Sequence, residues 1–220
     1  MIVSKDNERL KLIRKLHEKR WREKLGLFFV EGEDAVAAAT APPVDVLWAG
    51  EDVEPKLLAE VATLPHAPRV IGVYRRSDLP GWEERGATLA LWRLADPGNV
   101  GTLIRTAEAF GAAVALSEGC ADPTSPKALR ASAGSIWSVP VGTWAEAGGR
   151  RVALVAHGGE PLSTVDLSGQ VTFLLGAERE GLPNDVERDV DATIPIAGAE
   201  SLNVAVSGAL ALYERSRQLG

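Results

Sequence analysis

The sequence lacks the features that would place the protein in an oxidising compartment or in a membrane. It contains one cysteine, Cys120, in 220 residues, so no internal disulfide bond can form, as is typical of a reducing cytoplasm. No apolar stretch approaches the roughly 20 residues that cross a bilayer. The opening residues, MIVSKDNERLKLIRKL, have no apolar core of a secretion signal. We therefore expect a cytoplasmic protein that makes no membrane contact.

Common metal and nucleotide-phosphate motifs are also missing. The histidines at positions 17, 66 and 157 do not have the spacing of metal ligands, and one cysteine cannot build a zinc site. Neither GxGxxG nor GxxxxGK[ST] occurs in the chain. We therefore expect no metal ion. A nicotinamide-dependent enzyme is disfavoured, although it stays open as an alternative.

Positive charge is scarce overall but concentrated at one end of the chain. The formal net charge is -6. Residues 1–24 nevertheless hold nine Lys and Arg residues against four acids, so this end carries +5 and the remainder -11. Such asymmetry is typical of a site for a polyanion. It is equally typical of a solvated helix face, and charge alone does not separate the two interpretations.

The first third of the chain alternates short apolar strands with helical segments, which predicts a compact α/β unit. Asn7 followed by Glu8 is a typical helix start, and Gly26 is a typical helix end. The polar, turn-rich stretch 75–87 marks a boundary, so residues 1–80 are assigned to a first domain and 88–220 to a second. Strands are expected at 27–32, 44–50 and 69–74, and helices at 7–25, 33–40 and 54–63.

The second domain repeats the alternation with more continuous apolar strands. Such strands separated by helices indicate a parallel sheet covered on both faces. Ligands bind such sheets at the carboxyl ends of the strands. Strands are expected at 88–94, 112–116, 138–141, 152–156, 171–175 and 193–196, and helices at 99–110, 126–133, 183–188 and 202–217.

Three polar segments lie at those strand ends. In LADPGNVGTLIRTAEAFG (94–111), Asn99 can cap a helix. Arg105 lies among apolar neighbours and needs a partner, either Glu108 or a ligand. The segment LLGAEREGLP (174–183) is either an acidic surface turn or a place where glycines let the backbone approach a ligand. In ESLNVAVSGALALYE (200–214), Ser201 or Asn203 can cap a helix, and Gly208 indicates close packing against another element or another subunit.

Taken together and in this order, the three segments resemble the motifs of the SpoU/TrmH branch of the SPOUT superfamily, the RNA 2′-O-ribose methyltransferases. The motif N-x-G-x-x-x-R-(T/S)-A-x-x-x-G is matched from Asn99 through Arg105 to Gly111. The motif G-(S/A)-E-x-x-G is matched by Gly176, Glu178 and Gly181. The third, IP-(M/I)-x-G-x-x-x-SLNV-(S/A)-(V/A), is matched by Ile194, Pro195, Gly198 and Ser201 to Val204.

The first domain is similar to the L30e-like substrate-binding domain that many family members carry. The pattern R-x-x-x-G-x-F-x-x-EG is matched by Arg22, Gly26, Phe28, Glu31 and Gly32. The resemblance implies an α/β fold class in which a trefoil-knotted, parallel-sheet methyltransferase domain follows the small domain. It also implies a homodimer with the active site close to the interface, to which the small residues around Gly208 are suited.

The resemblance implies S-adenosyl-L-methionine as the cofactor, held in the knot largely by backbone groups. The residues expected to bind it are Leu175, Gly176, Ala177, Ile194, Ile196, Ser201, Leu202, Asn203 and Ala205.

The same resemblance assigns the catalytic residues. Arg105 matches the family's essential arginine, but a guanidinium stays protonated in proteins and is a poor general base. We hypothesise that Arg105 clamps an RNA phosphate and stabilises developing oxyanion character. Asn99 and Asn203 are expected to orient the ribose, and Ser201 to support the cofactor loop or an RNA phosphate. Glu178 is also assigned to the catalytic residues, without a more specific role.

The substrate implied is RNA, and the extra N-terminal domain favours ribosomal RNA over tRNA. The alternative is a non-catalytic RNA-binding or ribosome-assembly protein that keeps the knotted fold.

Overall fold

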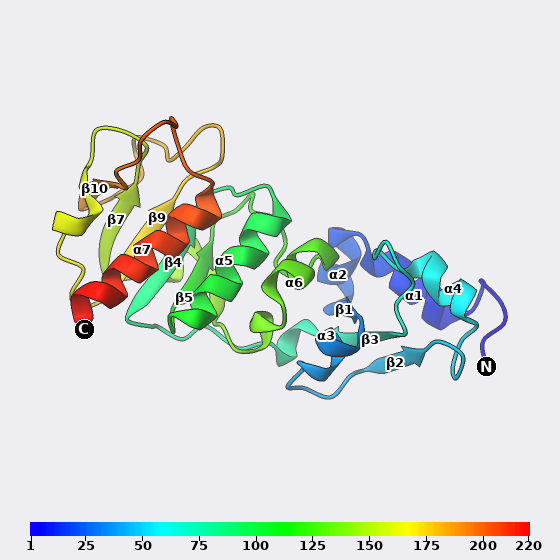
Figure 1. Cartoon of the computed structure of the whole chain (residues 1–220). Helices are drawn as coiled ribbons and strands as arrows, with labels where there is room; N and C mark the ends of the chain where they lie inside the picture. Colours follow the sequence, from blue (N-terminus) through cyan, green and yellow to red (C-terminus); the bar gives the residue numbers. More distant parts are fainter.

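The computed structural model describes all 220 residues, which form two β-sheets with their helices (Figure 1). A three-stranded sheet lies in the N-terminal part of the chain, and a seven-stranded sheet lies in the rest. None of the helices combines the length and apolarity that crossing a membrane requires.

The N-terminal sheet has the strand order β1-β3-β2, and both strand pairs are antiparallel. Its own core is formed by apolar side chains of α1, α4 and the sheet, such as Leu10, Leu47 and Leu58. The elements are α1 (Glu8–Leu16), α2 (Lys19–Leu25), β1 (Leu27–Glu31), α3 (Glu33–Ala37), β2 (Asp45–Trp48), α4 (Pro55–Val61) and β3 (Val70–Arg75), followed by the 3₁₀ turn η1 (Arg76–Asp78).

The single helix predicted for residues 7–25 is wrong, because the chain breaks into α1 and α2 at His17 and Glu18. Asn7 does cap α1, accepting a hydrogen bond from the Arg9 amide at 2.9 Å. The break is stabilised by Arg22, whose Nη1 donates to the carbonyls of Leu16 and His17 at 2.8 Å each. A side chain therefore satisfies carbonyl groups at the end of α1 that a continuous helix would have bonded internally.

The large sheet has the order β6-β5-β4-β9-β7-β10-β8, and every strand pair in it is parallel. The predicted parallel sheet is therefore confirmed. Its elements are β4 (Ala87–Leu91), α5 (Pro97–Ala109), β5 (Ala113–Leu116), α6 (Pro126–Ser132), η2 (Ser135–Trp137), β6 (Val141–Thr143), η3 (Trp144–Glu146), β7 (Arg150–Leu154), β8 (Glu160–Pro161), η4 (Leu162–Thr164), β9 (Val171–Leu175), β10 (Val190–Thr193) and α7 (Val204–Leu219).

Two predicted elements of this part are corrected. The helix expected at 183–188 is absent, and the strand expected at 193–196 lies earlier, as β10. The segment after Pro183 makes only a single turn, and the Arg188 guanidinium donates to the carbonyls of Pro183 and Asn184 at 3.2 and 3.1 Å. Pro195 has no amide hydrogen to donate to a neighbouring strand, which disfavours strand pairing at that point.

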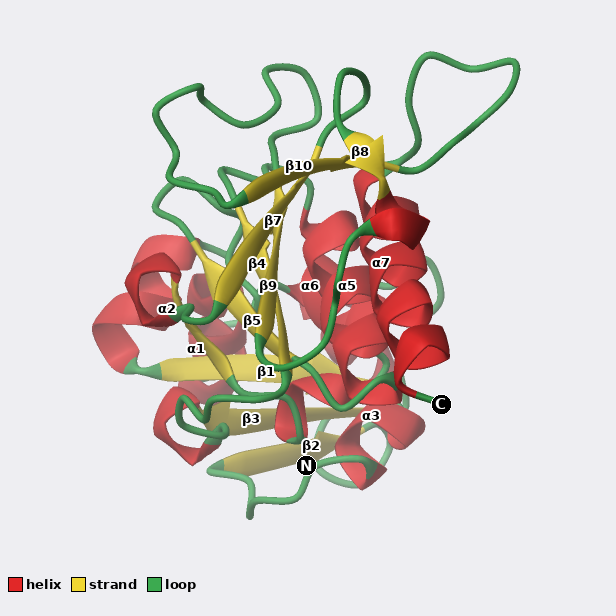
Figure 2. Cartoon of the chain, turned by 90° about the vertical axis from the view of Figure 1, so that its left-hand side faces the viewer, coloured by secondary structure: helices red, strands yellow, loops and turns green.

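The two faces of the large sheet are covered in different ways. Helices α5, α6 and α7 lie on one side of it (Figure 2). The other face presents small side chains, such as Ala90, Ala115 and Ala153, and is covered by turns and loops that carry Trp82 and Trp144. The sheet is covered on both faces, as predicted, but helices cover only one of them.

The two parts of the chain are joined by a continuous apolar contact. Strand β1 is buried on both sides because its residues alternate between two cores. Phe29 packs into the N-terminal core, whereas Phe28 and Val30 belong to the large core. Phe28 and Tyr74 both pack against Trp137, with ring centroids 5.6 and 5.0 Å apart.

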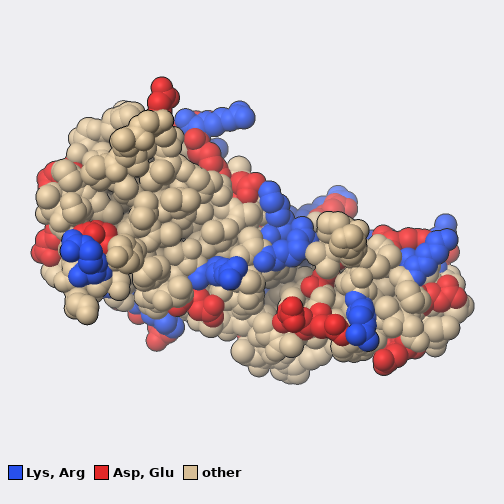
Figure 3. Space-filling view, viewed as in Figure 1, with Lys and Arg blue, Asp and Glu red and all other residues tan.

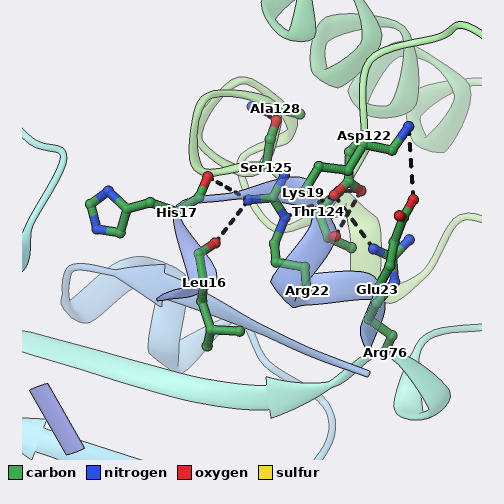
Figure 4. Close-up of polar contacts among 10 residues, drawn as sticks. All are labelled: Leu16, His17, Lys19, Arg22, Glu23, Arg76, Asp122, Thr124, Ser125 and Ala128. Carbon is green, nitrogen blue, oxygen red and sulfur yellow. Dashed lines mark hydrogen bonds and ion pairs between the residues drawn. The ribbon is translucent and has the colours of Figure 1, made fainter. Parts of the chain in front are cut away.

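A buried ion pair reinforces this contact (Figure 4). Arg22 Nε donates to Asp122 Oδ2 at 2.8 Å, and their side chains are 3 % and 2 % exposed. Asp122 also accepts from Arg76 Nη1 at 3.4 Å and from the amide and hydroxyl of Thr124 at 2.9 and 2.8 Å. Arg22 of the N-terminal pattern therefore faces the second part of the chain and not solvent.

Candidate active site

A cavity of about 510 Å³ lies at the carboxyl ends of β7, β9 and β10 of the large sheet. Parallel strands end at the same edge of the sheet, so β7, β9 and β10 deliver their following residues to one place. Val204 and Ser207, in the first turn of α7, also line the cavity. Of the predicted cofactor residues, those lining this cavity are Leu175, Gly176, Ala177, Ile194, Ile196, Ser201, Leu202 and Asn203.

Ala205 is the predicted cofactor residue that does not line the cavity. It lies in the first turn of α7, is 5 % exposed, and donates its amide to Asn203 Oδ1 at 2.9 Å. Its side chain packs into the large core, so it supports the loop without reaching the cavity.

The loop after β9 is shaped by two glycines. Ala177 and Gly181 exchange backbone hydrogen bonds of 3.1 and 2.9 Å, which folds residues 177–181 into a closed loop. A Cβ at Gly176 would lie 2.3 Å from the Gly181 carbonyl carbon, so only glycine fits at this position. Gly181 has a φ of +68°, in the left-handed region that favours glycine. The glycines of the second motif thus bring the backbone to the cavity wall.

A chain of three polar side chains forms the rim of the cavity. Asn203 Nδ2 donates to Asn99 Oδ1 at 3.2 Å, and Asn99 Nδ2 donates to Glu178 Oε1 at 3.0 Å. These residues come from the start of α7, the first turn of α5 and the loop after β9. The structure therefore brings one polar residue from each of the three motifs into direct contact.

Helix capping at this rim differs partly from the prediction. Asn203 caps α7, because its Oδ1 accepts from the amides of Ala205 and Val206. Asn99 does not cap α5, because Asp96 holds that position and accepts from the Asn99 amide at 3.0 Å. A hydrogen bond from Lys127 at 2.7 Å holds the pKa of the Asp96 carboxyl below its usual value. The Asn99 side chain is thereby left for Glu178 and Asn203.

Arg105 lies outside this arrangement. It is exposed on α5 and does not line the cavity. Arg105 and Glu108 form no ion pair in the structure, so the surface pair considered from the sequence is wrong. Glu108 accepts from the hydroxyls of Ser135, at 2.6 Å, and Ser138. These hydrogen bonds lower the pKa of Glu108, and the nearby charge of Arg105 contributes.

Part of the cavity wall comes from residues that no sequence motif indicates. Leu154, the last residue of β7, and the two residues after it, Val155 and Ala156, line the cavity beside the second and third motifs. The signal available was the end of the expected strand 152–156, since ligands bind at strand ends. This stretch carries no polar or glycine residue at the strand end to mark it as part of a site. Arg179, Gly181, Ala192, Val204 and Ser207 also line the cavity.

A more open cleft of about 880 Å³ adjoins the cavity. The two share Ala177, Glu178, Arg179 and Asn203, so Glu178 and Asn203 of the rim face both, whereas Asn99 lines only the cleft. Arg93 and Gly119 line the cleft but not the cavity. No group of three or more His, Cys, Asp or Glu side chains in the structure could hold a metal ion. The arrangement is that of a cavity lined mostly by apolar residues and a cleft lined mostly by polar ones, with Glu178 and Asn203 facing both.

Comparison with known proteins agrees with this geometry. Residues 86–213 match the model of the SpoU rRNA Methylase family, and residues 7–76 match an MRM3-like substrate binding domain. The 23S rRNA (guanosine(2553)-2′-O)-methyltransferase RlmP of Bacillus subtilis is 31% identical over 245 residues, which covers 96% of this chain and 97% of that protein.

Solved structures show the same architecture. An S-adenosylmethionine-bound rRNA methyltransferase from Sinorhizobium meliloti has a TM-score of 0.87 at 30% identity and covers 100% of this chain and 98% of its own. The SpoU methyltransferase AviRb from Streptomyces viridochromogenes, also in complex with this cofactor, has a TM-score of 0.83 at 28% identity, with 97% and 98% covered. The predicted SPOUT α/β fold is confirmed, and the threading of the knot stays a prediction. The chain belongs to the SpoU rRNA methylase family.

Proposed function

We propose that this protein transfers a methyl group from S-adenosyl-L-methionine to a ribose 2′-hydroxyl of RNA, and that the RNA is ribosomal. The observation that carries the proposal is the contact of Asn99, Glu178 and Asn203 at the rim of a cavity of about 510 Å³. Three family motifs that lie far apart in the sequence meet there around one cavity.

The cavity suits the proposed cofactor. Its volume lies within the few hundred to about 1,000 Å³ of small-molecule sites. The walls are largely aliphatic, with Leu154, Leu175, Ile194 and Ile196 among the lining residues. A Cβ at Gly176 would collide with backbone, so the main chain itself forms the wall there. Apolar walls and exposed main chain are what an adenine ring requires.

When bound, the cofactor supplies a methyl group on a sulfonium, which is already a good leaving group. The protein must therefore position the hydroxyl in line and assist its deprotonation. Asn99 and Asn203, on the side facing the open cleft, are suited to orient the ribose. Glu178 holds the Asn99 amide at 3.0 Å and so fixes which of its atoms faces the cleft. Ser201 is proposed to support the cofactor loop.

Exchanging Asn203 separates its structural role from its proposed catalytic one. In Asn203→Ala the α7 cap is lost, which should lower the free energy of unfolding by about 1 kcal/mol. Asn203→Asp keeps the capping oxygen but has no N–H to donate to Asn99. We expect Asn203→Asp to melt close to the wild type and yet to lose most methyl transfer. Denaturant unfolding and a labelled-methyl assay measure the two effects, and an Asp variant with wild-type turnover would contradict the role in orientation.

We propose that the protein is a homodimer through the outer surface of α5 and α7. Val206, Leu210 and Tyr213 recur at helical spacing on α7 and are 46%, 37% and 58% exposed. Gly208 lies on the opposite side of α7, where a Cβ would come within 2.4 Å of Leu103 of α5. Exposed apolar side chains arranged along one helix are typical of a protein interface. Arg105 lies exposed on the adjacent α5, so a dimer would place it near a subunit interface.

A charge placed on this surface should produce a monomer. Leu210→Arg would have to bury a guanidinium without a partner in the interface, which is costly. We expect sedimentation equilibrium to give a mass near 23 kDa for this variant and twice that for the wild type. Lys56→Arg on α4, in the N-terminal part, is the matched control and should stay dimeric. A wild type that sediments as a monomer at micromolar concentration would contradict the dimer.

The RNA contact is proposed to include the first two helices. Lys15, Arg20 and Lys24 lie around the half-buried Trp21, each between 5.2 and 5.6 Å from its ring. Lys and Arg atoms also gather where α6 meets the N-terminal part (Figure 3), and α6 carries Lys127 and Arg130. Phosphate neutralisation dominates RNA affinity, and an aromatic ring among cations can stack an unpaired base.

The decisive experiment is methyl transfer from labelled S-adenosylmethionine to total RNA, followed by mapping of 2′-O-methylation. The B. subtilis relative acts on a guanosine of 23S rRNA, so 23S rRNA is the first substrate to test, with tRNA as the comparison. RNA binding without methyl transfer would favour the non-catalytic alternative. Calorimetry with NAD addresses the nicotinamide alternative.

We further propose that the enzyme acts in the cytoplasm and needs no metal, so chelators should not lower its rate.

A further inference from the structure

Arg93 holds an unusual backbone conformation next to the rim. Its φ is +49°, and only one other non-glycine residue in the structure, Ala133, has a positive φ. This left-handed region is unfavourable for residues with a Cβ. Residues held in such conformations cluster at functional sites, where the surrounding structure fixes them. The position would suit glycine better, yet it carries a long cationic side chain.

The chain on either side of Arg93 fixes this conformation. The Arg93 amide donates to Ser117 Oγ at 2.8 Å, and Ser117 Oγ donates to the Glu118 carbonyl at 3.1 Å. Trp92 donates its amide to the Leu175 carbonyl at 2.8 Å, and the Leu94 carbonyl accepts from Ala121 at 2.7 Å. Arg93 is thus a rigid point between β4 and α5.

The Arg93 side chain extends over Gly119, where a Cβ would lie 3.3 Å from Arg93 Nε. From there it lines the open cleft together with Asn99, Glu178 and Asn203. The side chain is exposed and makes no hydrogen bond or ion pair within the chain. Lys127, by contrast, is paired with Asp96 at the same end of α5. A rigidly based guanidinium without a partner therefore faces the cleft beside the ribose-orienting asparagines.

We propose that Arg93 binds a backbone phosphate of the RNA adjacent to the target ribose and so fixes that nucleotide in the cleft. This inference rests on the proposed function. Every internal ribose of an RNA chain is flanked by phosphates, and a guanidinium can hold a phosphate through two parallel hydrogen bonds. The fixed backbone lowers the entropic cost of aiming the long side chain. Arg93 is a positioning residue for the RNA and takes no part in cofactor binding.

The test compares Arg93→Ala and Arg93→Lys with the wild type and with Arg150→Ala. Arg150→Ala removes the same charge at the start of β7, at the edge of the sheet opposite the carboxyl ends of the strands. We measure the dissociation constant of a fluorescein-labelled 23S rRNA transcript by anisotropy. For Arg93→Ala it should rise about tenfold, which corresponds to about 1.4 kcal/mol, and the slope of log affinity against log salt should fall by about one. Arg93→Lys should fall in between, and Arg150→Ala should match the wild type.

Two further readouts separate this role from its alternatives. The affinity for S-adenosylmethionine, measured by calorimetry without RNA, should be unchanged in Arg93→Ala. A loss of cofactor affinity would overturn the proposal, because the guanidinium would then hold the cofactor carboxylate. Arg93→Gly should melt at or above the wild-type temperature while binding RNA as weakly as Arg93→Ala, since glycine tolerates positive φ.

Equal RNA affinity in Arg93→Ala and the wild type would also overturn the proposal. Because affinity is measured without turnover, this result can be told apart from failure of the proposed function, in which the wild type binds RNA but transfers no methyl group.

Discussion

Replacement of Arg105 by lysine should lower the rate of methyl transfer by about a hundredfold or more, the usual effect of removing one preorganised donor to developing charge. Lysine keeps the positive charge but cannot offer the paired N–H groups that hold a phosphate from two sides. Arg105 is exposed on α5 and its side chain fills no core, so the exchange should leave the fold intact. The measurement is single-turnover transfer from labelled S-adenosylmethionine to RNA.

Two controls belong to this experiment. Arg150→Lys makes the same exchange at an exposed position remote from the rim and should leave the rate unchanged. Calorimetry should give wild-type cofactor affinity for Arg105→Lys, because Arg105 does not line the cavity. If Arg105→Lys transfers methyl groups at the wild-type rate, the bidentate clamp is wrong and only charge is needed.

Replacement of Arg22 by leucine should destabilise the whole protein by about 3 kcal/mol, the lower end of the range for breaking a buried ion pair. The change leaves Asp122, 2% exposed, with Arg76 at 3.4 Å as its remaining cation. It also removes the donor to the carbonyls of Leu16 and His17, where α1 ends. A loss of this size should lower the melting temperature of a chain this long by about 10 °C.

Arg20→Leu is the matched control, because Arg20 lies on the same helix, is 73% exposed and pairs with Glu18 only at the surface. It should change the free energy of unfolding by no more than about 1 kcal/mol. Equal melting temperatures for the two variants would mean that the ion pair does not join the two parts of the chain.

The difference in unfolding free energy between the wild type and Arg22→Leu should depend on pH. Burial by itself raises the pKa of Asp122, but the charge of Arg76 and hydrogen bonds from Thr124 and Arg22 outweigh it and hold the pKa below its usual value. In the wild type, the carboxylate therefore contributes stability above the unfolded pKa of about 3.9, and loses it as pH falls through the lower folded value. In Arg22→Leu, protonation also neutralises the buried Asp122 carboxylate, which has lost its hydrogen bond from Arg22, so the difference in unfolding free energy between the two proteins should narrow below about pH 4.

The sequence determined those features that depend on neighbouring residues and repeating pattern. Apolar strands between helices predicted the parallel sheet, because a strand buried on both faces needs no polar alternation. Asn7 was predictable as a helix cap, and for α7 the choice narrowed to Ser201 or Asn203, because Asn and Ser side chains accept hydrogen bonds from the free amides of a first helical turn. The three motifs also determined the family, since their order and spacing are visible in the printed chain.

Contacts between distant segments depend on the tertiary structure, and they set the side-chain partners of several of these residues. Arg22 stabilises the break between α1 and α2 and binds Asp122, 100 residues away, although the sequence showed it only as part of the pattern of the substrate-binding domain. Asp96 caps α5, so the Asn99 side chain is free to contact Glu178 and Asn203. The left-handed backbone at Arg93 depends on a hydroxyl 24 residues later, in the turn after β5. A local pattern specifies which side chains can donate or accept hydrogen bonds. Their partners depend on packing across the sheet and between the two parts of the chain. A short stretch of sequence holds no information about that packing.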